Sequence, residues 1–213
     1  MMPGEVEVKA MLAKGGIPVN EGYAVHSAAE AAEMARHMGF PVVVKVLSPK
    51  IPHKSDLGLV DLNLCSPDAV GDAYERIVKK ARTIDPDASA VVEAMAAQGT
   101  EVIIGAKRDP QFGPTVLFGL GGIFVEVFKD VSIRVAPVNR QMALSMIKEI
   151  KGYAILKGFR GKSAVDLEAL ADVIVKTSRL MMSDESIMEL DMNPVMAYDK
   201  GAMAVDARAL IKD

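Results

Sequence analysis

The sequence of 213 residues has no tryptophan, few aromatic residues (5% of the chain) and one cysteine, Cys65. A single cysteine excludes an intrachain disulfide and a zinc site built from cysteines. No apolar run is long enough to cross a bilayer, and the first residues, Met-Met-Pro-Gly-Glu-Val-Glu, lack the apolar core of a signal peptide. We therefore expect a cytoplasmic protein that has no membrane partner.

The chain also has fewer positive than negative side chains, with 25 Lys and Arg residues, 28 Asp and Glu residues and a net charge of −3. No basic run is present, which argues against a nucleic-acid partner. Common phosphate-binding motifs are missing too. There is no Gly-x-x-x-x-Gly-Lys-Ser/Thr segment, and Phe124 stands where a dinucleotide fingerprint starting at Gly119 would need a small residue.

What the chain does contain is an alternation of strand-like and helix-like segments, with hydrophobic residues making up half of the sequence. Ser27 and Glu30 form a capping box, Gly39 suits a left-handed helix end, and Ser66 and Asn139 suit helix starts. The pattern predicts an α/β (α+β) fold. Helices are expected over 5–14, 27–38, 66–82, 139–150 and about 164–181, and strands over 23–25, 41–47, 60–64, 90–95, 101–107, 115–118, 123–128, 131–136, 186–192, 195–198 and 202–206.

A change of composition at 96–99, Ala-Ala-Gln-Gly, indicates a hinge between two parts of the chain. We expect a smaller lobe over 20–97 and a larger lobe over 98–213, with the helix of 1–19 packing on the larger lobe.

Lys45 is the only charge in an otherwise apolar strand, Val-Val-Val-Lys-Val-Leu at 42–47. A buried ammonium without a partner costs several kcal/mol or loses its proton. Lys45 therefore needs an anion, either a carboxylate of the protein or the phosphate of a bound ligand. Glu93 repeats the pattern just before the hinge, and it suits either an internal pair with Lys45 or a nucleotide clamp formed with Met95 and backbone groups.

His53 follows the lysine strand in a loop that also holds Lys54, Ser55 and Asp56. A histidine in such a loop is usually solvated. Neutral imidazole is nevertheless a good nucleophile toward phosphorus near pH 7, and a carboxylate such as that of Asp56 can orient it. His53 is therefore a candidate catalytic residue.

Two features beyond the hinge suit a nucleotide. Glu101 begins the first strand there and could accept a ribose hydroxyl or pair with a second lysine. Gly121 and Gly122 lie between strand-like runs and suit a turn where the backbone comes close to a ligand such as phosphate.

Oxygen-bearing side chains gather near the end of the sequence. Asp191 and Asn193 lie where a strand is expected to stop, at a turn formed by Asn193 and the following proline, and Asp206 ends the strand expected to pair with it. Pairing would bring Asn193 and Asp206 together, and Mg²⁺ is usually held by one or two such ligands plus phosphates and waters. The alternative is a plain turn beside a surface charge.

Together these residues resemble the nucleotide-binding (beta) subunit of the ADP-forming acyl-CoA synthetases, the family of acetate–CoA ligase, which uses an ATP-grasp fold. The resemblance covers nearly the whole chain, and position 59 departs from it, since Leu59 stands where the family pattern has a second glycine. The matching segments are Val-Val-Val-Lys-Val at 42–46, Ser-Pro-x-x-x-His-Lys-Ser-Asp-x-Gly at 48–58, Glu-Val-Ile-Ile-Gly-Ala-Lys-Arg-Asp-Pro-Gln-Phe-Gly-Pro at 101–114, Phe-Gly-Leu-Gly-Gly-Ile-Phe-Val-Glu at 118–126, Leu-Lys-Gly-Phe-Arg-Gly at 156–161 and Glu-Leu-Asp-Met-Asn-Pro at 189–194.

The resemblance implies an ATP-grasp fold of two lobes with the nucleotide site between them. It implies that Lys45 holds the phosphates of ATP or ADP, that Glu93 and Glu101 face the adenosine, and that Asn193 and Asp206 bind Mg²⁺.

The resemblance also implies an activity, acid + CoA + ATP to acyl-CoA + ADP + phosphate, in which His53 is transiently phosphorylated. Arg134 and Arg160 would touch the phosphoryl group in transit. A CoA-binding (alpha) subunit would complete a hetero-oligomeric ligase that forms carbon–sulfur bonds. Two alternatives remain: a stand-alone ATP-grasp ligase joining a carboxylate to an amine, which needs no phosphohistidine, and a non-catalytic nucleotide-binding module.

Overall fold

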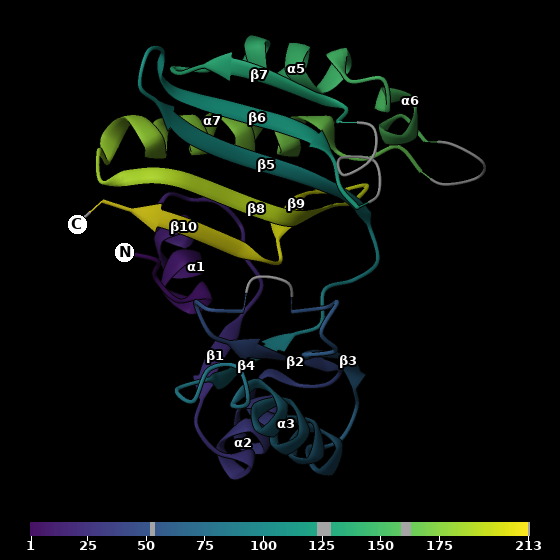
Figure 1. Cartoon of the computed structure of the whole chain (residues 1–213). Helices are drawn as coiled ribbons and strands as arrows, with labels where there is room; N and C mark the ends of the chain where they lie inside the picture. The colour runs from purple at the N-terminus through teal and green to yellow at the C-terminus, as the bar shows by residue number, and fades with distance from the viewer. Residues whose placement is uncertain (52–53, 123–128, 159–162, 213) are drawn as a thin grey trace. The chain divides into compact units, whose positions relative to one another are not determined.

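The computed structural model describes residues 1–51, 54–122, 129–158 and 163–212. The chain forms two compact units (Figure 1). The smaller unit consists of Gly4–Glu7 and Asn20–Ala97, and the larger unit consists of Met1–Pro3, Val8–Val19 and Gln98–Asp213. The first turn of the N-terminal helix α1 (Glu5–Lys14) thus belongs to the smaller unit, whereas the sequence placed residues 1–19 entirely with the larger part.

The smaller unit is a four-stranded antiparallel sheet in the order β1-β4-β2-β3. Helices α2 and α3 cover one face of this sheet (Figure 1), and the core between them consists of valine, isoleucine, leucine and alanine side chains with one tyrosine. Its elements are β1 (Gly22–Val25), α2 (Ala28–Met38), β2 (Val42–Leu47), β3 (Val60–Leu64), α3 (Pro67–Ala81) and β4 (Ser89–Ala94).

Helix α2 begins as the sequence predicted, with one difference. The Ser27 hydroxyl accepts a hydrogen bond from the Glu30 N–H at 3.1 Å, but the Glu30 carboxylate accepts from the N–H of His26, one residue before the cap. At the other end Gly39 has φ 85° and ψ 162°, so its φ is positive but the residue is not in the left-handed helical region. A positive φ favours glycine in either case.

The larger unit is a six-stranded antiparallel sheet in the order β10-β8-β5-β6-β7, with β9 also paired to β8. Helices α5 and α7 cover one face of this sheet (Figure 1), and the apolar core lies beneath them. Its elements are β5 (Thr100–Asp109), β6 (Gly113–Leu120), β7 (Val131–Val135), α5 (Arg140–Glu149), α6 (Tyr153–Leu156), α7 (Leu167–Ser183), β8 (Ile187–Ala197), β9 (Ala202–Ala204) and β10 (Ala207–Ile211).

The turn predicted at Asn193 and Pro194 is wrong, because β8 runs through both residues as one strand. In the pairing with β5, Val195 lies opposite Val102 and Met192 lies opposite Ile104. Two residues of β8 therefore face one residue of β5, which is a β-bulge, and a bulge is one of the few places where a paired strand accepts proline.

Helix α7 begins three residues later than predicted, after Asp166, whose carboxylate accepts from the Ala169 N–H at 2.9 Å. The hairpin of β5 and β6 and the cap at Asn139 are confirmed. The strand expected over 123–128 lies outside the described residues. No helix in the described part of the chain is both long and apolar enough to cross a membrane.

Candidate active site

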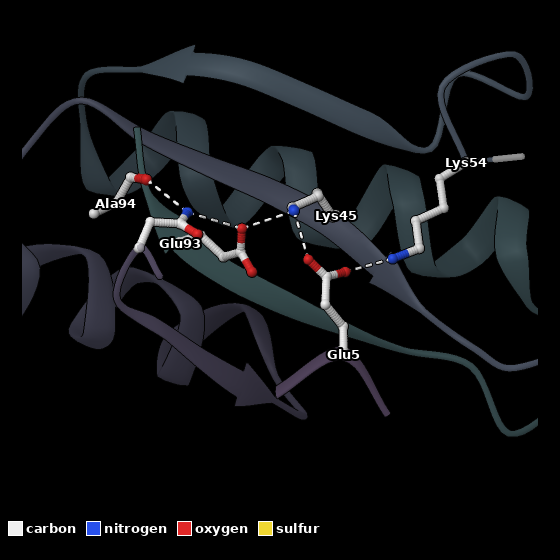
Figure 2. Close-up of polar contacts among 6 residues, drawn as sticks. Glu5, Lys45, Lys54, Glu93 and Ala94 are labelled. Atoms are coloured by element: carbon white, nitrogen blue, oxygen red, sulfur yellow. Dashed lines mark hydrogen bonds and ion pairs between the residues drawn. The ribbon is translucent and has the colours of Figure 1, made fainter. Parts of the chain in front are cut away.

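In the smaller unit, Lys45 lies at the centre of a buried cluster of charges (Figure 2). Its ammonium lies 2.7 Å from Glu5 Oε1 and 2.7 Å from Glu93 Oε2. The second oxygen of Glu5 lies 2.5 Å from the ammonium of Lys54. All four side chains are at most 7% exposed, and two ammonium groups balance two carboxylates. Burial is tolerated because each charge has an opposite charge within hydrogen-bonding distance.

The structure thus realises the protein-carboxylate alternative for Lys45, because Glu93 is its partner across neighbouring strands. Glu93 is fully buried, and its carboxylate also accepts from Asn20 Nδ2 at 3.1 Å. The carboxylate is thus engaged within the smaller unit, and its expected place facing an adenosine stays a prediction. The need for an anion beside Lys45 does not by itself identify a phosphate.

Met95 follows β4 directly and is partly buried. Its N–H donates to the Pro41 carbonyl at 3.2 Å, so this backbone donor is used within the smaller unit. The Ala94 carbonyl accepts from Asn20 (Figure 2). Any contact of Met95 with a nucleotide base therefore has to come from its carbonyl or its side chain.

Glu5 and Lys54 were not singled out from the sequence as partners of Lys45. Glu5 opens a helix and Lys54 lies in a loop, and such positions are usually solvated. Their burial follows from tertiary structure, which joins segments 40 residues and more apart. The sequence signal that could have drawn attention to Lys54 is its position directly after the candidate nucleophile His53.

His53 itself lies outside the described residues, but the segments on both sides of it are well fixed. Before it, the Ser48 hydroxyl and the Lys50 ammonium donate to the buried Asp85 carboxylate at 2.6 and 2.9 Å. These two hydrogen bonds hold the pKa of the Asp85 carboxyl below its ordinary value. After it, the Lys54 carbonyl accepts from the N–H of the fully buried Leu59 at 2.9 Å.

In the larger unit, Glu101 lies beside Gly121 and Gly122, which the sequence had suggested separately as nucleotide contacts. The Gly121 N–H donates to the Glu101 carbonyl at 2.9 Å. A Cβ on Gly121 would lie 3.0 Å from Glu101 Cβ, and Gly122 has φ 61°. Both positions therefore favour glycine, one for space and one for backbone conformation.

A cavity of about 550 Å³ opens beside Glu101 within the larger unit. Residues around the start of β5 and the end of β8 form most of its lining. Its lining residues are Gln98, Gly99, Thr100, Glu101, Ser163, Val165, Met196, Ala197, Tyr198 and Asp199. This volume is in the range of small-molecule sites.

Asn193 and Asp206 are neighbours, as the sequence predicted. The Asn193 N–H donates to the Asp206 carbonyl at 3.1 Å. Asp206 Oδ1 is buried and has no hydrogen-bond partner among the described residues. A buried carboxylate oxygen without a donor fits a cation, because a cation satisfies the lone pairs that protein donors leave open.

Asp191 lies on the same strand, opposite Arg208 of β10. The Asp191 side chain keeps some exposed surface, but partial removal of water from around its carboxyl raises the pKa of that group. The charge of Arg208 opposes this shift, and the charge of Asp206 adds to it. No group of three or more His, Cys, Asp or Glu side chains in the described part of the chain could hold a metal. Mg²⁺ is usually held by one or two protein oxygens together with phosphates and waters, so a site at Asn193 and Asp206 does not require such a group.

Arg134 lies apart from these residues. It stands opposite the buried Val116 in the β6–β7 pairing, and its guanidinium pairs with Glu149 of α5. Successive residues of a strand face opposite sides of the sheet, so Arg134 lies on the helix-covered face and Glu101 on the other. This placement does not support the expected contact with a phosphoryl group. Arg160 lies outside the described residues.

Comparison with known proteins shows the family of the chain. The family model of the ATP-grasp domain matches residues 2–211. The chain is 48% identical over 210 residues to the beta subunit of acetate–CoA ligase [ADP-forming] I of Pyrococcus furiosus, covering 97% of this chain and 90% of the relative.

Solved structures agree with the sequence comparison. Acetyl-coenzyme A synthetase 1 of Ca. Korarchaeum cryptofilum, in complex with coenzyme A and Ca-AMPCP, matches with a TM-score of 0.96 and 47% identity, over 99% of this chain and 93% of that chain. A second structure of that protein, with Mg-AMPPCP and its phosphohistidine segment pointing towards the nucleotide binding site, matches with a TM-score of 0.86 and 48% identity, over 98% and 92% of the two chains. The chain therefore belongs to the ATP-grasp family and, within it, to the beta subunits of the ADP-forming acetate–CoA ligases.

Proposed function

We propose that the chain binds ATP or ADP and passes a phosphoryl group between the nucleotide and His53, as one subunit of an ADP-forming acyl-CoA synthetase. The net reaction is acid + CoA + ATP to acyl-CoA + ADP + phosphate, so the complete enzyme is a ligase that forms carbon–sulfur bonds. The observation that carries the proposal is the pair of buried ammonium groups, Lys45 and Lys54, on either side of the His53 segment in sequence. The Korarchaeum protein supports it, since its phosphohistidine segment points towards the nucleotide.

In the transfer step a lone pair of the neutral His53 imidazole forms a bond to the γ-phosphorus. The bond from that phosphorus to the bridging oxygen breaks, and ADP leaves with the electron pair. The ring then relieves its positive charge by releasing the proton of its other nitrogen. Transfers of this kind depend mainly on positioning and on neutralisation of charge, which the cationic side chains of the smaller unit supply.

Lys45 is the proposed ligand of the nucleotide phosphates. Its ammonium is already held by Glu5 and Glu93, so phosphate binding has to compete with carboxylates. A triphosphate carries more negative charge than a single carboxylate, and exchange of one anion for another keeps the buried ammonium paired.

The larger unit supplies the remaining contacts. The Glu101 carboxylate accepts a hydrogen bond from a ribose hydroxyl at the edge of the cavity that Glu101 lines. The backbone at Gly121 and Gly122 approaches the phosphates. Asn193 and Asp206 would hold Mg²⁺, with the unpartnered Oδ1 of Asp206 as the first ligand. A bound Mg²⁺ supplies neutralisation of the charge on the phosphate oxygens.

The partner in this proposal is a CoA-binding (alpha) subunit. The test combines the purified chain with that subunit and measures ADP and acyl-CoA for a panel of carboxylic acids. Formation of both products in equal amounts, dependent on CoA, is the expected result. ADP formation that requires an amine acceptor and proceeds without CoA would contradict the proposal and would favour a carboxylate–amine ligase.

A further inference from the structure

The carboxylate of Asp130, the residue before β7, fixes the turn that leads into α6. Its Oδ1 accepts from the Lys151 N–H at 2.8 Å, and its Oδ2 accepts from the Gly152 N–H at 2.7 Å. Hydrogen bonds from backbone N–H groups to a carboxylate are charge-assisted and stronger than those to a neutral acceptor. One side chain therefore holds two consecutive peptide units that lie 21 and 22 residues further along the chain.

The turn held by Asp130 packs closely on Leu120, the residue before the Gly121 and Gly122 pair. A Cβ on Gly152 would lie 2.1 Å from Leu120 Cδ1 and 3.2 Å from Asp130 Oδ2. Gly152 has φ −73°, which any residue adopts, so glycine is needed here for space and not for backbone conformation. The Asp130 carboxylate and the Leu120 side chain thus meet at one glycine.

The backbone of Asp130 also lies against β6. A Cβ on Gly119 would lie 2.8 Å from the Asp130 carbonyl oxygen, because β6 and β7 pair at that point. Asp130 therefore reaches the end of β6 in two ways, directly at Gly119 and by way of Gly152 at Leu120. Residues 123–128 lie outside the described part of the chain, and none of these contacts involves them.

The end of β6 leads into the two glycines proposed to approach the phosphates. Gly121 donates its N–H to the Glu101 carbonyl at 2.9 Å, and a Cβ on Gly122 would lie 3.7 Å from Glu101 Oε2. Consecutive Cα atoms are about 3.8 Å apart, so a shift of Leu120 is passed on to Gly121. The position of Leu120 therefore affects the backbone that faces the nucleotide in the proposed function.

We propose that Asp130 is a positioning residue for the binding of the nucleotide phosphates, acting through Gly152 and Leu120. The inference rests on the proposed function, since it takes the backbone at Gly121 and Gly122 as a phosphate contact. It does not depend on which side chain accepts the phosphoryl group. Both carboxylate oxygens of Asp130 are engaged by the turn, so Asp130 itself is not a ligand of the nucleotide.

The test measures the Kd of the full chain for ATP with Mg²⁺ and for adenosine, together with the melting temperature. Asp130→Asn keeps the size of the side chain, but an amide has one acceptor oxygen, so one of the two backbone N–H groups loses its partner. We expect ATP to bind about tenfold more weakly. Adenosine, which has no phosphate, should bind as it does to the wild type. A purely structural role would change both affinities equally or neither of them.

Asp109→Asn is the matched control. The Asp109 carboxylate also accepts from two backbone N–H groups, those of Gln111 at 2.8 Å and Phe112 at 3.0 Å. Asp109 ends β5, whereas Glu101 lies near the start of that strand. The control should lower the melting temperature and leave the Kd for ATP unchanged. An equal loss of ATP affinity in Asp109→Asn and Asp130→Asn would overturn the proposal.

Gly152→Ala tests the same route at its second step, and it decides the matter if Asp130→Asn does not fold. Leu120 is 2% exposed, so its side chain cannot turn away from an added methyl group without disturbing the core. ATP affinity should again fall while adenosine affinity stays the same. If Asp130 acts through Gly152, the two substitutions combined weaken ATP binding by less than the product of their separate effects. A combined effect equal to that product would overturn the proposal.

These results are distinct from failure of the proposed function. If the wild type binds ATP but is not phosphorylated, only the transfer step of the proposed function fails, and the comparison of ATP with adenosine still decides the role of Asp130. If the wild type and both variants bind ATP equally tightly, only the role of Asp130 is contradicted. If the wild type does not bind ATP, the proposed function and the role of Asp130 are both wrong.

Discussion

The Lys45 ammonium lies 2.7 Å from the Glu93 carboxylate, and both side chains are buried on neighbouring strands of the smaller unit. An ion pair in this position contributes little net stability compared with an apolar pair, but removal of one partner leaves an uncompensated buried charge. The lysine proposed to bind phosphate is therefore also part of the folded structure of the unit. Variants at this position have to separate the two effects.

We predict that Lys45→Met lowers the free energy of unfolding by about 3–5 kcal/mol, because it removes the ammonium that lies between the buried carboxylates of Glu5 and Glu93. The same substitution should abolish measurable binding of ATP. Urea denaturation gives the stability, and calorimetric titration of folded protein gives the affinity.

The double variant Lys45→Met with Glu93→Gln is the control for folding. It removes one charge of each sign, and Glu5 keeps Lys54, so most of the lost stability should return while ATP binding should not. Glu93→Gln alone should bind ATP more tightly than the wild type, because a competing carboxylate is gone. Normal ATP affinity in the double variant would show that Lys45 is only structural.

Asp206→Asn should remove the response to magnesium without destabilising the protein. Its Oδ1 is buried without a donor among the described residues, so loss of the charge costs nothing in the metal-free protein and can stabilise it by about 1 kcal/mol. At 100 times the dissociation constant, Mg-ADP should stabilise the wild type by about 2.7 kcal/mol, and this shift should be lost in the variant. Thermal unfolding with and without Mg-ADP measures both effects.

Glu189→Gln serves as the control for Asp206→Asn, because Glu189 lies on β8 and pairs with Lys107 at 2.6 Å on an exposed surface. It should keep the full stabilisation by Mg-ADP. A normal magnesium response in Asp206→Asn would remove this residue from the metal site.

Gly122→Ala and Gly113→Ala form a matched pair. Both residues have positive φ, 61° and 75°, so each substitution should cost about 1 kcal/mol of stability. Only Gly122 lies beside Glu101, since a Cβ there would be 3.7 Å from Glu101 Oε2, whereas nothing lies within 4 Å of a Cβ at Gly113. Nucleotide affinity should fall in Gly122→Ala alone, and an equal fall in both would indicate a general effect of strain.

Stability at low pH should depend on Asp85. Hydrogen bonds from Ser48 and Lys50 lower the pKa of this carboxyl in the folded chain relative to the unfolded chain. Its contribution is therefore complete above the ordinary pKa of about 3.9 and is lost as the pH falls through the lowered value. Unfolding by urea between pH 2 and pH 6 should show a shallower fall for Asp85→Asn than for the wild type or for Asp87→Asn. Equal slopes would contradict this role.

The sequence predicted the larger part of the fold because strand and helix signals are local. It also predicted that Asn193 and Asp206 are neighbours, since a short turn between paired strands requires it. The turn at Asn193 was wrong because Asn-Pro has the same local preference in a turn and in a bulge, and only pairing with β5 separates them.

The buried cluster contains contacts that local sequence patterns cannot predict. The unusual positions of Lys45 and Glu93 are visible in their strands, and their pairing was one of the alternatives considered. Glu5 and Lys54 carry no such sign, because their burial is created by contacts between distant segments. The face on which Arg134 lies depends on strand register, which the apolar pattern alone did not fix.

The most direct test of the account is labelling of the chain by γ-labelled ATP in the presence of Mg²⁺. We predict an acid-labile, base-stable phosphoryl group on His53 of the wild type that is chased by ADP, and no label in His53→Asn, which should still bind ATP with unchanged affinity. Equal labelling of the wild type and His53→Asn would contradict the account.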